Sequence, residues 1–240
     1  MNQHTTPVEV GIIGAMKIEV DALCDMMQDA SVEEIAGIAF HRGTLCGRSV
    51  VVAQCGVGKV FAAMCAQAMI LIYAPSVIVN TGVAGTLTNK LSIGQVAIAD
   101  RLVQHDMDTS PLGDPRGLIS GINMVYFPAD PKASACLADC VAAEGVTYAT
   151  GTVASGDQFI ATQAQKDFIK STFENVVACE MEGASIGHVC YMNATPCAVL
   201  RAISDGGDDN ASMDFPTFCA HAAQVAIRVM VRFLNTWGRS

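Results

Sequence analysis

The 240-residue sequence predicts a single-domain, three-layer α/β/α protein with a mixed central sheet. Short apolar runs rich in Val and Ile alternate with segments of helical periodicity along the chain. Most of these runs are nearly continuous, as expected for strands that are covered on both faces of a sheet. The composition agrees, because 51% hydrophobic and 15% charged residues are typical of one compact domain with a large core.

The expected elements follow one another without a linker, a repeat or a low-complexity tract. Strands are predicted over 8–14, 49–54, 77–81, 95–102, 151–154, 176–179 and 198–203. Helices are predicted over 17–27, 59–73, 131–144, 163–173, 182–192 and 215–236. Pro216 fits the first turn of the last helix, with Asp214 as its cap. One domain over residues 1–240 is therefore expected, with residues 1–7 as a short polar tail.

The charge and the cysteines exclude several classes of function. A net charge of −9 with scattered Lys and Arg argues against nucleic acid, whose binding needs a clustered basic face. The ten cysteines include no CxxC pair and no secretory leader precedes them, which favours reduced thiols in the cytoplasm and no metal site or cofactor. The apolar segment 61–79 is interrupted by Gln67 and split at Pro75, so it falls short of the ~20 residues that a membrane span needs.

Three acidic residues stand at or just beyond the ends of strand-like runs that lie far apart in the sequence. They are Glu19, Glu182 and Asp205. Ligands of open α/β sheets bind beyond the carboxyl ends of the strands. The sequence therefore predicts one active site that these carboxylates share.

Other motifs have simpler alternative interpretations. The loops 56–59 and 82–85 are glycine-rich, but Val60 stands where a phosphate-binding P-loop has Ser or Thr, so tight turns explain them equally well. Glu180 and Glu182 flank Met181, and an exposed helix N-terminus accounts for this triplet slightly better than a site does. Arg201 interrupts an apolar strand and requires an anionic or hydrogen-bonding partner, whether structural or functional. The pair His105-Asp106 is interpreted as a structural hydrogen bond.

Taken together, these motifs resemble the 5′-methylthioadenosine/S-adenosylhomocysteine nucleosidases of the purine nucleoside phosphorylase-like superfamily. The resemblance covers nearly the whole chain from about Val8. Its segments are GIIGAMKIEV (11–20), CGVGKV (55–60), NTGVAG (80–85), SGDQFI (155–160), ACEMEGASIGHVC (178–190) and RAISD (201–205). The resemblance implies a nucleoside phosphorylase-like fold and hydrolysis of the bond between adenine and a 5′-thio-substituted ribose, which recycles products of S-adenosylmethionine use.

The resemblance also implies roles for the polar residues. Asp205 would be the general acid that protonates adenine N7, and Ser204 would orient it. Glu182 would bind the ribose hydroxyls and favour the positive charge that develops on the sugar. Glu19 would position and activate the attacking water, with Arg201 as its orienting partner.

The remaining expected substrate contacts are mostly apolar or come from the backbone. Phe159 would stack on adenine while the Ile160 backbone reads its edge. The other expected contacts are Met16, Val57, Val83, Ala84, Gly85, Met181 and Phe215.

Three other functions remain as alternatives. A phosphorylase of the same superfamily would need to hold phosphate, which Glu19 would repel and Arg201 alone would hold poorly. A hydrolase acting on 6-amino-6-deoxyfutalosine would use the same site. A nucleoside-binding module without turnover is disfavoured, because binding alone does not require a water-activating base.

The sequence departs from the family pattern at three positions. Val83 replaces a frequent Ser, and Thr109 and Leu112 stand where more apolar or aromatic residues are common. In the family, the loop that corresponds to 107–123 helps to close the pocket of a neighbouring subunit. The resemblance therefore implies a homodimer, and the departures leave the preferred 5′-substituent open.

Overall fold

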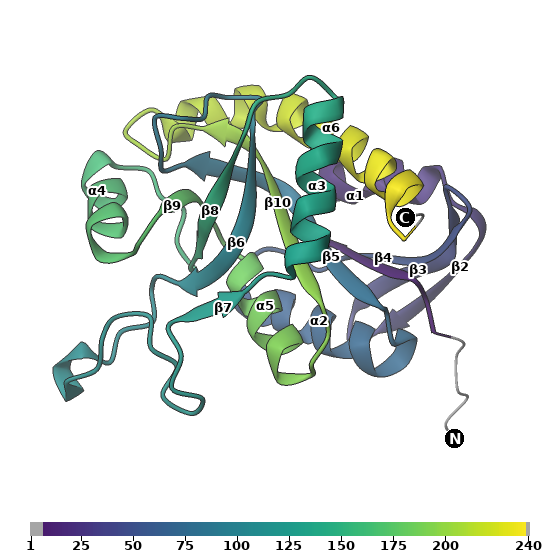
Figure 1. Ribbon diagram of the computed structural model, residues 1–240, viewed down its shortest axis with the longest axis horizontal. Coiled ribbons are helices and arrows are strands. Elements are labelled where there is room, and N and C mark those ends of the chain that lie inside the picture. The colour runs from purple at the N-terminus through teal and green to yellow at the C-terminus, as the bar shows by residue number, and fades with distance from the viewer. Residues whose placement is uncertain (1–6, 239–240) are drawn as a thin grey trace.

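The computed structural model describes residues 7–238, so the predicted tail at 1–7 lies, apart from Pro7, outside the described residues. Strands and helices alternate along the chain, as the sequence predicts (Figure 1). The strands are β1 (Val10–Gly14), β2 (Gln28–Ile35), β3 (Ile38–Leu45), β4 (Arg48–Gln54), β5 (Val77–Thr86), β6 (Val96–Gln104), β7 (Tyr126–Pro128), β8 (Tyr148–Ser155), β9 (Val176–Glu180) and β10 (Cys197–Asp205). The helices are α1 (Lys17–Asp25), α2 (Lys59–Tyr73), α3 (Pro131–Ala143), α4 (Gln163–Thr172), α5 (Gly183–Met192) and α6 (Ala211–Thr236), with one 3₁₀ turn, η1 (Ser110–Leu112).

All ten strands belong to one mixed sheet. The order β10-β6-β8-β9-β5-β1-β4-β3-β2 describes it, and β10 also pairs with β5. Because of this additional pairing, β10, β6, β8, β9 and β5 form a closed ring of strands, from which β1, β4, β3 and β2 continue as an open sheet. The long strand β5 links the two parts, since it pairs with β1 along one edge and with β10 along the other.

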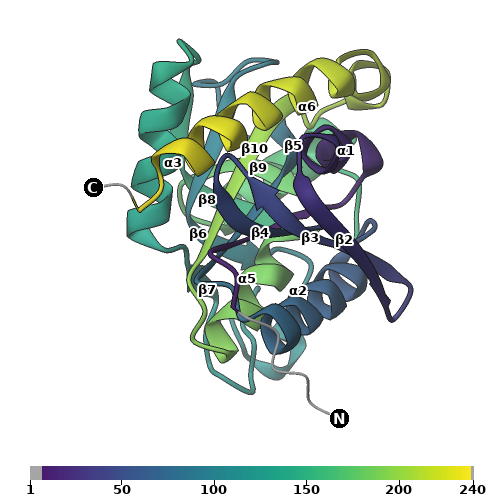
Figure 2. The same cartoon turned by 90° about the vertical axis from the view of Figure 1, so that its right-hand side faces the viewer.

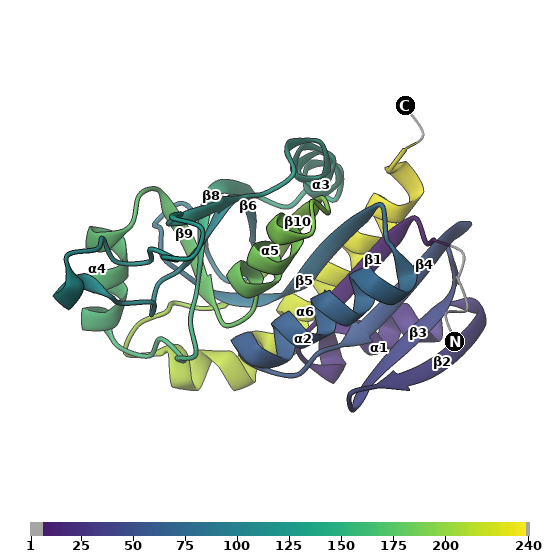
Figure 3. The same ribbon diagram turned by 90° about the horizontal axis from the view of Figure 1, so that it is seen from below.

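Helices cover the sheet in two layers, and each layer has its own hydrophobic cluster. α1, α3 and α6 lie on one face, and α2 and α5 lie on the other (Figure 2). α4 stands apart beside β9, where it contributes to a smaller cluster (Figure 3). This arrangement confirms the predicted three-layer α/β/α class.

Three strands that the sequence analysis did not predict are present. β2 has the sequence QDASVEEI and is exposed along almost its whole length, so it lacks the apolar run that marks a buried strand. β3 pairs with it as a hairpin, and β7 is only three residues long. β2 is the edge strand, β7 pairs with β6, and β3 lies between β2 and β4 with only some of its residues buried, so none of them carries a continuous apolar run.

The start predicted for the last helix is wrong. α6 begins at Ala211, so Asp214 is not its cap and Pro216 lies inside it rather than in its first turn. The backbone N–H groups of Met213 and Asp214 already donate to the Asn210 carbonyl at 2.9 and 3.0 Å, which begins the helix one turn earlier. Pro216 has no N–H, so α6 lacks the hydrogen bond that this position would otherwise donate to the carbonyl of Ser212.

The apolar segment 61–79 is split, as the sequence predicts: α2 ends at Tyr73 and β5 begins at Val77. Within residues 7–238, α6 is the one helix that is long and apolar enough to cross a membrane. In the most apolar stretch of α6, 56% of the residues are buried within the fold, and the helix packs against β10 and β5. It is therefore a helix of the protein core.

Gly151 in β8 permits a close approach to the chain that leads into β9. A Cβ atom at this position would lie 2.5 Å from the Asn175 carbonyl oxygen, which is backbone and has little freedom to move. We expect Gly151→Ala to lower the free energy of unfolding by about 1–3 kcal/mol, measured by urea denaturation. Gly121→Ala is the matched control, since a Cβ there meets nothing within 4 Å. Equal stability of the two variants would contradict this prediction.

Candidate active site

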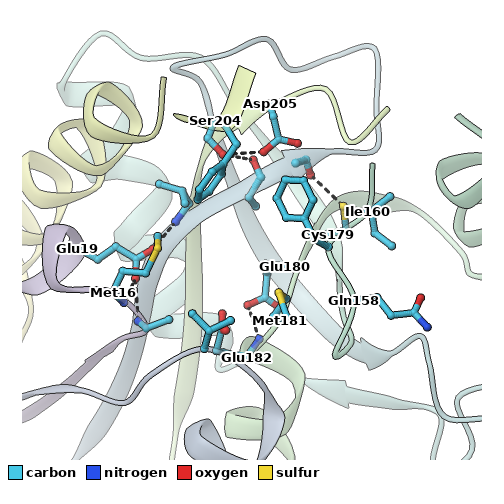
Figure 4. A pocket seen from close by; sticks show the side chains of 17 residues that line it. Met16, Glu19, Gln158, Ile160, Cys179, Glu180, Met181, Glu182, Ser204 and Asp205 are labelled. Atoms are coloured by element: carbon cyan, nitrogen blue, oxygen red, sulfur yellow. Dashed lines mark hydrogen bonds between the residues drawn. The ribbon is translucent and has the colours of Figure 1, made fainter. Parts of the chain in front are cut away.

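One cavity of about 260 Å³ lies beyond the carboxyl ends of β1, β5, β9 and β10. Figure 4 shows Glu19, Glu182 and Asp205 on three sides of it. The lining residues are Ala15, Met16, Glu19, Val57, Val83, Ala84, Gly85, Gln158, Phe159, Ile160, Cys179, Glu180, Met181, Glu182, Ser204, Asp205 and Phe215. The wall is mostly apolar, so the few polar groups on it define where a ligand can be held.

Glu19, in the first turn of α1, is buried and bonded through both carboxylate oxygens. Oε2 accepts hydrogen bonds from the backbone N–H groups of Ala15 at 2.7 Å and Met16 at 2.9 Å. Oε1 accepts a third from the N–H of Val83 at 3.0 Å. Burial raises the pKa of Glu19, while the nearby Arg201 and these N–H donors counteract the rise. The result is a fixed carboxylate that is a stronger base than an exposed glutamate.

A side chain at Gly82 in β5 would collide with two charged groups of the site. A Cβ there would lie 2.5 Å from Glu19 Oε1 and 2.7 Å from Arg201 Nη1. Both groups therefore pack directly against the backbone of β5. The glycine-rich segment 82–85 is part of strand β5 and not the tight turn that was expected. It leaves room for the charged groups and supplies a backbone N–H to Glu19.

Arg201 of β10 lies behind the cavity wall and is only 1% exposed. Its guanidinium donates through Nε to Glu180 Oε2 at 3.1 Å, and Nη2 also bonds this oxygen. Nη2 donates in addition to Asn80 Oδ1 at 2.6 Å, and it lies 3.7 Å from Glu182 Oε2. Arg201 was expected among the substrate contacts, but the structure places it among side chains rather than in the cavity lining.

Glu180, at the end of β9, is the carboxylate with the most hydrogen-bond partners. Besides Arg201, it accepts from the Ser155 hydroxyl and from the N–H groups of Glu182 at 3.0 Å and Gly183 at 2.8 Å. Burial alone would raise the pKa of Glu180, but the Arg201 charge and the Ser155 hydroxyl hold it below the ordinary value. Glu180 is therefore an ionised anchor for the turn that carries Glu182.

Glu182 is the N-cap residue of α5 and is 5% exposed, so the exposed helix N-terminus considered for the triplet is not what the fold contains. The backbone turns between Glu180 and the start of α5, so both glutamates approach Arg201. Glu182 Oε1 accepts from the Gly58 N–H at 2.9 Å. Burial and the neighbouring Glu180 raise the pKa of Glu182 to about 7.

Asp205 ends β10 on another side of the cavity. The Ser204 hydroxyl donates to its Oδ2 at 2.8 Å, and the Gly207 N–H donates to its Oδ1 at 2.9 Å. Burial raises the pKa of Asp205, and the charges of Asp214 and Asp208 act in the same direction. A raised pKa is what a carboxylic acid needs in order to donate a proton near neutral pH.

Two aromatic rings stand at the mouth of the cavity. Phe159 and Phe215 meet edge to face, with ring centroids 5.6 Å apart, and Phe159 is 44% exposed. An exposed aromatic face beside an acid and a buried wall fits a flat heterocyclic ligand. Ile160, the next residue, is buried in the cluster that also holds α4 in place.

Except for Arg201, every predicted site residue lines the cavity. Four lining residues were not predicted: Ala15, Gln158, Cys179 and Glu180. Glu180 was noticed only as part of its triplet. One signal could have identified Glu180. Arg201 interrupts an apolar strand and needs an acidic partner, and Glu180 stands at the end of another apolar strand.

Three donors of the loop 56–59 that a phosphate could otherwise use already have protein partners. Gly58 N–H bonds Glu182, Lys59 N–H bonds Asp157 Oδ1 at 2.8 Å, and Lys59 Nζ pairs with Asp106 Oδ1 at 2.7 Å. The hydrogen bond predicted for the His105-Asp106 pair is not what the fold contains. Asp106 accepts instead from Lys59 and from the Asp157 N–H at 2.9 Å, and within residues 7–238 the buried His105 Nε2 has no hydrogen-bond partner. Over residues 7–238, no group of three or more His, Cys, Asp or Glu side chains is placed to hold a metal ion.

The mostly apolar cavity thus combines a base, a third carboxylate and an acid beside an aromatic platform. Glu19 can take a proton, Asp205 can give one, and Glu182 offers a hydrogen-bond acceptor on the third side (Figure 4). Such a separation of acid and base suits cleavage of a glycosidic bond with attack by water.

Comparisons of the sequence and of the fold with known proteins indicate the same family. A sequence profile of the phosphorylase superfamily matches residues 9–235. A 5′-methylthioadenosine/S-adenosylhomocysteine nucleosidase of Haemophilus influenzae is 34% identical over 95% of this chain and 99% of its own. A crystal structure of such a nucleosidase from Neisseria meningitidis, in complex with methylthio-immucillin-A, superposes with a TM-score of 0.91 at 30% identity and covers 96% of this chain and 99% of that one. A futalosine hydrolase of Helicobacter pylori superposes with a TM-score of 0.90 at 32% identity, covering 95% and 98%.

Replacing Glu182 by Gln should stabilise the fold more at pH 8 than at pH 5. The folded protein holds the Glu182 proton more tightly than the unfolded chain, since its pKa rises from 4.5 to about 7. The resulting stabilisation is complete below the unfolded value and is lost as the pH rises through the folded one. Because Gln does not titrate, the variant should gain roughly 2 kcal/mol over the parent between these pH values in urea unfolding. A gain that does not change with pH would mean that Glu182 is ionised throughout.

Proposed function

Because the chain belongs to the phosphorylase superfamily and, within it, to the 5′-methylthioadenosine/S-adenosylhomocysteine nucleosidases, we propose that its cavity hydrolyses 5′-thio-substituted adenine nucleosides. The protein is an N-glycosyl hydrolase. Its reaction cleaves the bond between adenine N9 and ribose C1′ and adds water at C1′. The products are adenine and the thioribose, methylthioribose or S-ribosylhomocysteine.

The hydrogen bonds of Glu19 are the observation that favours hydrolysis over phosphorolysis. A phosphorylase needs cationic side chains or free backbone N–H groups beside the ribose to hold phosphate. Here the N–H groups of Ala15, Met16 and Val83 all donate to the Glu19 carboxylate. A second anion would find these donors occupied and a negative charge beside them. Water meets neither obstacle, and Glu19 can accept its proton.

Asp205 is the proposed source of the proton that adenine takes at N7. Its pKa is raised by burial, and its Oδ2 is fixed by Ser204. As the proton moves to N7, the electrons of the C1′–N9 bond pass to the neutralised base, which leaves as adenine. General acid catalysis of this kind contributes ~10²–10⁴-fold.

Glu182 is the proposed partner of the ribose hydroxyls. Its carboxyl group lines the cavity on a different side from Glu19 and Asp205 (Figure 4), and Arg201 Nη2 lies 3.7 Å from its Oε2. Positive charge that develops on the ribose would be stabilised by this group and by Glu19. We assign Phe159 and the Ile160 backbone to adenine, and Met16, Val57, Met181 and Phe215 to the sugar and its 5′-substituent.

The futalosine hydrolase likeness supports one second activity. That relative shares the fold at 32% identity, which is similar to the identity with the nucleosidases. Thr109 and Leu112, the positions that depart from the family pattern, lie in a segment that projects from the body of the chain (Figure 1). Neither residue lines the cavity of its own chain, so both could act on the 5′-substituent only from a neighbouring subunit. Cleavage of an aminofutalosine nucleoside is therefore the alternative to test beside the thio-nucleosides.

We propose that the protein is a homodimer and that segment 107–123 reaches the pocket of the partner. Exposed apolar side chains on the first turns of α2 support this proposal. Val60 is 70% exposed, Phe61 53% and Met64 42%, and Val57 beside them is 50% exposed and also lines the cavity. A contiguous apolar patch at the mouth of a cavity is typical of a surface that a second subunit covers.

We further propose that residues 1–240 act as one domain in the cytoplasm. All ten cysteines are free, and burial raises the pKa of several of their thiols, including Cys55 and Cys65. Reduced, unreactive thiols are typical of proteins in a reducing compartment.

Adenine release from 5′-methylthioadenosine should be equally fast with and without phosphate. The expected sugar product is free methylthioribose, detected by mass spectrometry. Glu19→Gln and Asp205→Asn should each lower kcat by about 10²–10⁴-fold, because each removes a proton-transfer group. Release only in phosphate, with a sugar 1-phosphate as product, would identify a phosphorylase and overturn the role of Glu19.

Val60→Glu should shift the protein toward monomers in analytical ultracentrifugation. The carboxylate would stand in the proposed apolar interface without a partner, which disfavours association. Val32→Glu is the matched control, since Val32 is also exposed but lies on the distant edge strand β2. A parent protein that sediments as a monomer would contradict the proposed homodimer.

A further inference from the structure

Lys166 on α4 is a buried lysine that the proposed reaction does not use. Its exposed fraction is 9%, and its Nζ donates a hydrogen bond of 2.6 Å to the carbonyl oxygen of Gly206. Among residues 7–238, no carboxylate oxygen lies within ion-pairing distance of this ammonium group. Lysine is rarely buried without a paired charge, because removing an ammonium group from water is costly. A mere contact between α4 and the loop could be made by a neutral residue at lower cost.

The bonded carbonyl belongs to the peptide that also serves the proposed acid. The peptide unit between Gly206 and Gly207 contains the Gly206 carbonyl and the Gly207 N–H, which point in opposite directions in a trans peptide. Lys166 bonds the carbonyl, and the N–H donates to Asp205 Oδ1 at 2.9 Å. One rigid plane therefore connects the ammonium group to the carboxyl group. A hydrogen bond at the carbonyl also polarises the peptide and strengthens its N–H as a donor.

Gly207 packs against the backbone of β5, but the two glycines have no side chains that could hold the peptide between them. Gly207 also has a positive φ of 60°. A side chain at Gly206 would collide with the Asp208 carboxylate. Without Lys166, the plane could rotate and withdraw its N–H from Asp205.

α4 is well placed to control this peptide. Lys166 and Ile169 are its two buried residues, three positions apart on one face. Ile169 packs in the same cluster as Ile160 and Cys179, which both line the cavity. The backbone N–H of Gln163, the first residue of α4, also bonds Asp209 in the loop that follows Asp205. The helix thus spans from the adenine side of the cavity to the loop of the acid.

We propose that Lys166 is a positioning residue that acts on the general acid Asp205 through the peptide between Gly206 and Gly207. This inference rests on the proposed role of Asp205. The Gly207 N–H stabilises the carboxylate that remains once Asp205 has given its proton to adenine N7. Lys166 therefore favours the step in which the leaving group is protonated and the C1′–N9 bond breaks. It does not act on the attack of water, which occurs at Glu19.

A pair of substrates with different leaving groups tests this proposal. Adenine needs protonation in order to leave, whereas 4-nitrophenolate leaves as a stable anion. Lys166→Met keeps the length of the side chain and removes its donor and charge. We expect the kcat for 5′-methylthioadenosine to fall by about 10- to 100-fold with KM little changed, as a misplaced catalytic group would cause. Hydrolysis of 4-nitrophenyl 5-methylthioriboside should stay within about twofold of the parent.

Several variants serve as controls. Lys166→Arg retains a cationic donor and should restore most of the adenine release. Lys170→Met removes an exposed lysine from the same helix and should change neither rate. Asp205→Asn should show the same dependence on the leaving group as Lys166→Met, and the double variant should lose no more than Asp205→Asn alone. If Lys166→Met does not fold, Lys166→Gln carries the same comparison.

Two results would overturn the inference. Equal losses on both substrates would make Lys166 a structural residue, and an unchanged rate of adenine release would show that the peptide needs no such support. A different result would instead contradict the proposed function: an Asp205→Asn variant that releases adenine at the parent rate would mean that Asp205 is not the acid.

Discussion

The buried guanidinium of Arg201 determines how this site can hold its glutamates. This group bonds Glu180, lies 3.7 Å from Glu182 and, together with Glu19, packs against Gly82. One positive charge cannot neutralise three buried carboxylates, and Glu180 takes most of it. Burial raises the pKa values of Glu19 and Glu182, the charge of Glu180 raises that of Glu182 further, and Arg201 offsets the rise only in part. A cavity with unsatisfied negative charge stabilises a ribose that becomes cationic more than it stabilises the neutral substrate, which is the preference that catalysis requires.

The fold positions these groups through backbone as much as through side chains. Glu19, Glu182 and Asp205 each accept at least one backbone N–H, from Val83 in β5, Gly58 before α2 and Gly207 after β10. Backbone donors on strands and helix ends move little, so they fix carboxylates more firmly than flexible side chains would. This also explains why a valine at position 83 is compatible with the site, because the donor there is its main-chain N–H.

The sequence was most informative where burial imposes a pattern. α2 has the bounds that were predicted, and the seven predicted strands are all present, because continuous Val and Ile runs identify strands inside the sheet. β2 could not be predicted from such a run, since it is a polar strand at an edge. The residues around the cavity were predicted mainly from motif resemblance. The network of Glu180, Arg201 and Asn80 was missed, because partners from three distant strands leave no periodic signal in the sequence.

The position of β10 has a consequence for how the protein is made. This strand is the last in the chain, yet it lies between β5 and β6, which are synthesised more than ninety residues earlier. A nascent chain that stops before β10 lacks Arg201, so Glu180 would have to be buried without its cation. Such long-range pairing is slow to form and cannot be replaced by local structure. On the ribosome, catalytic competence and a stable core must therefore arise together, and only when synthesis is almost complete.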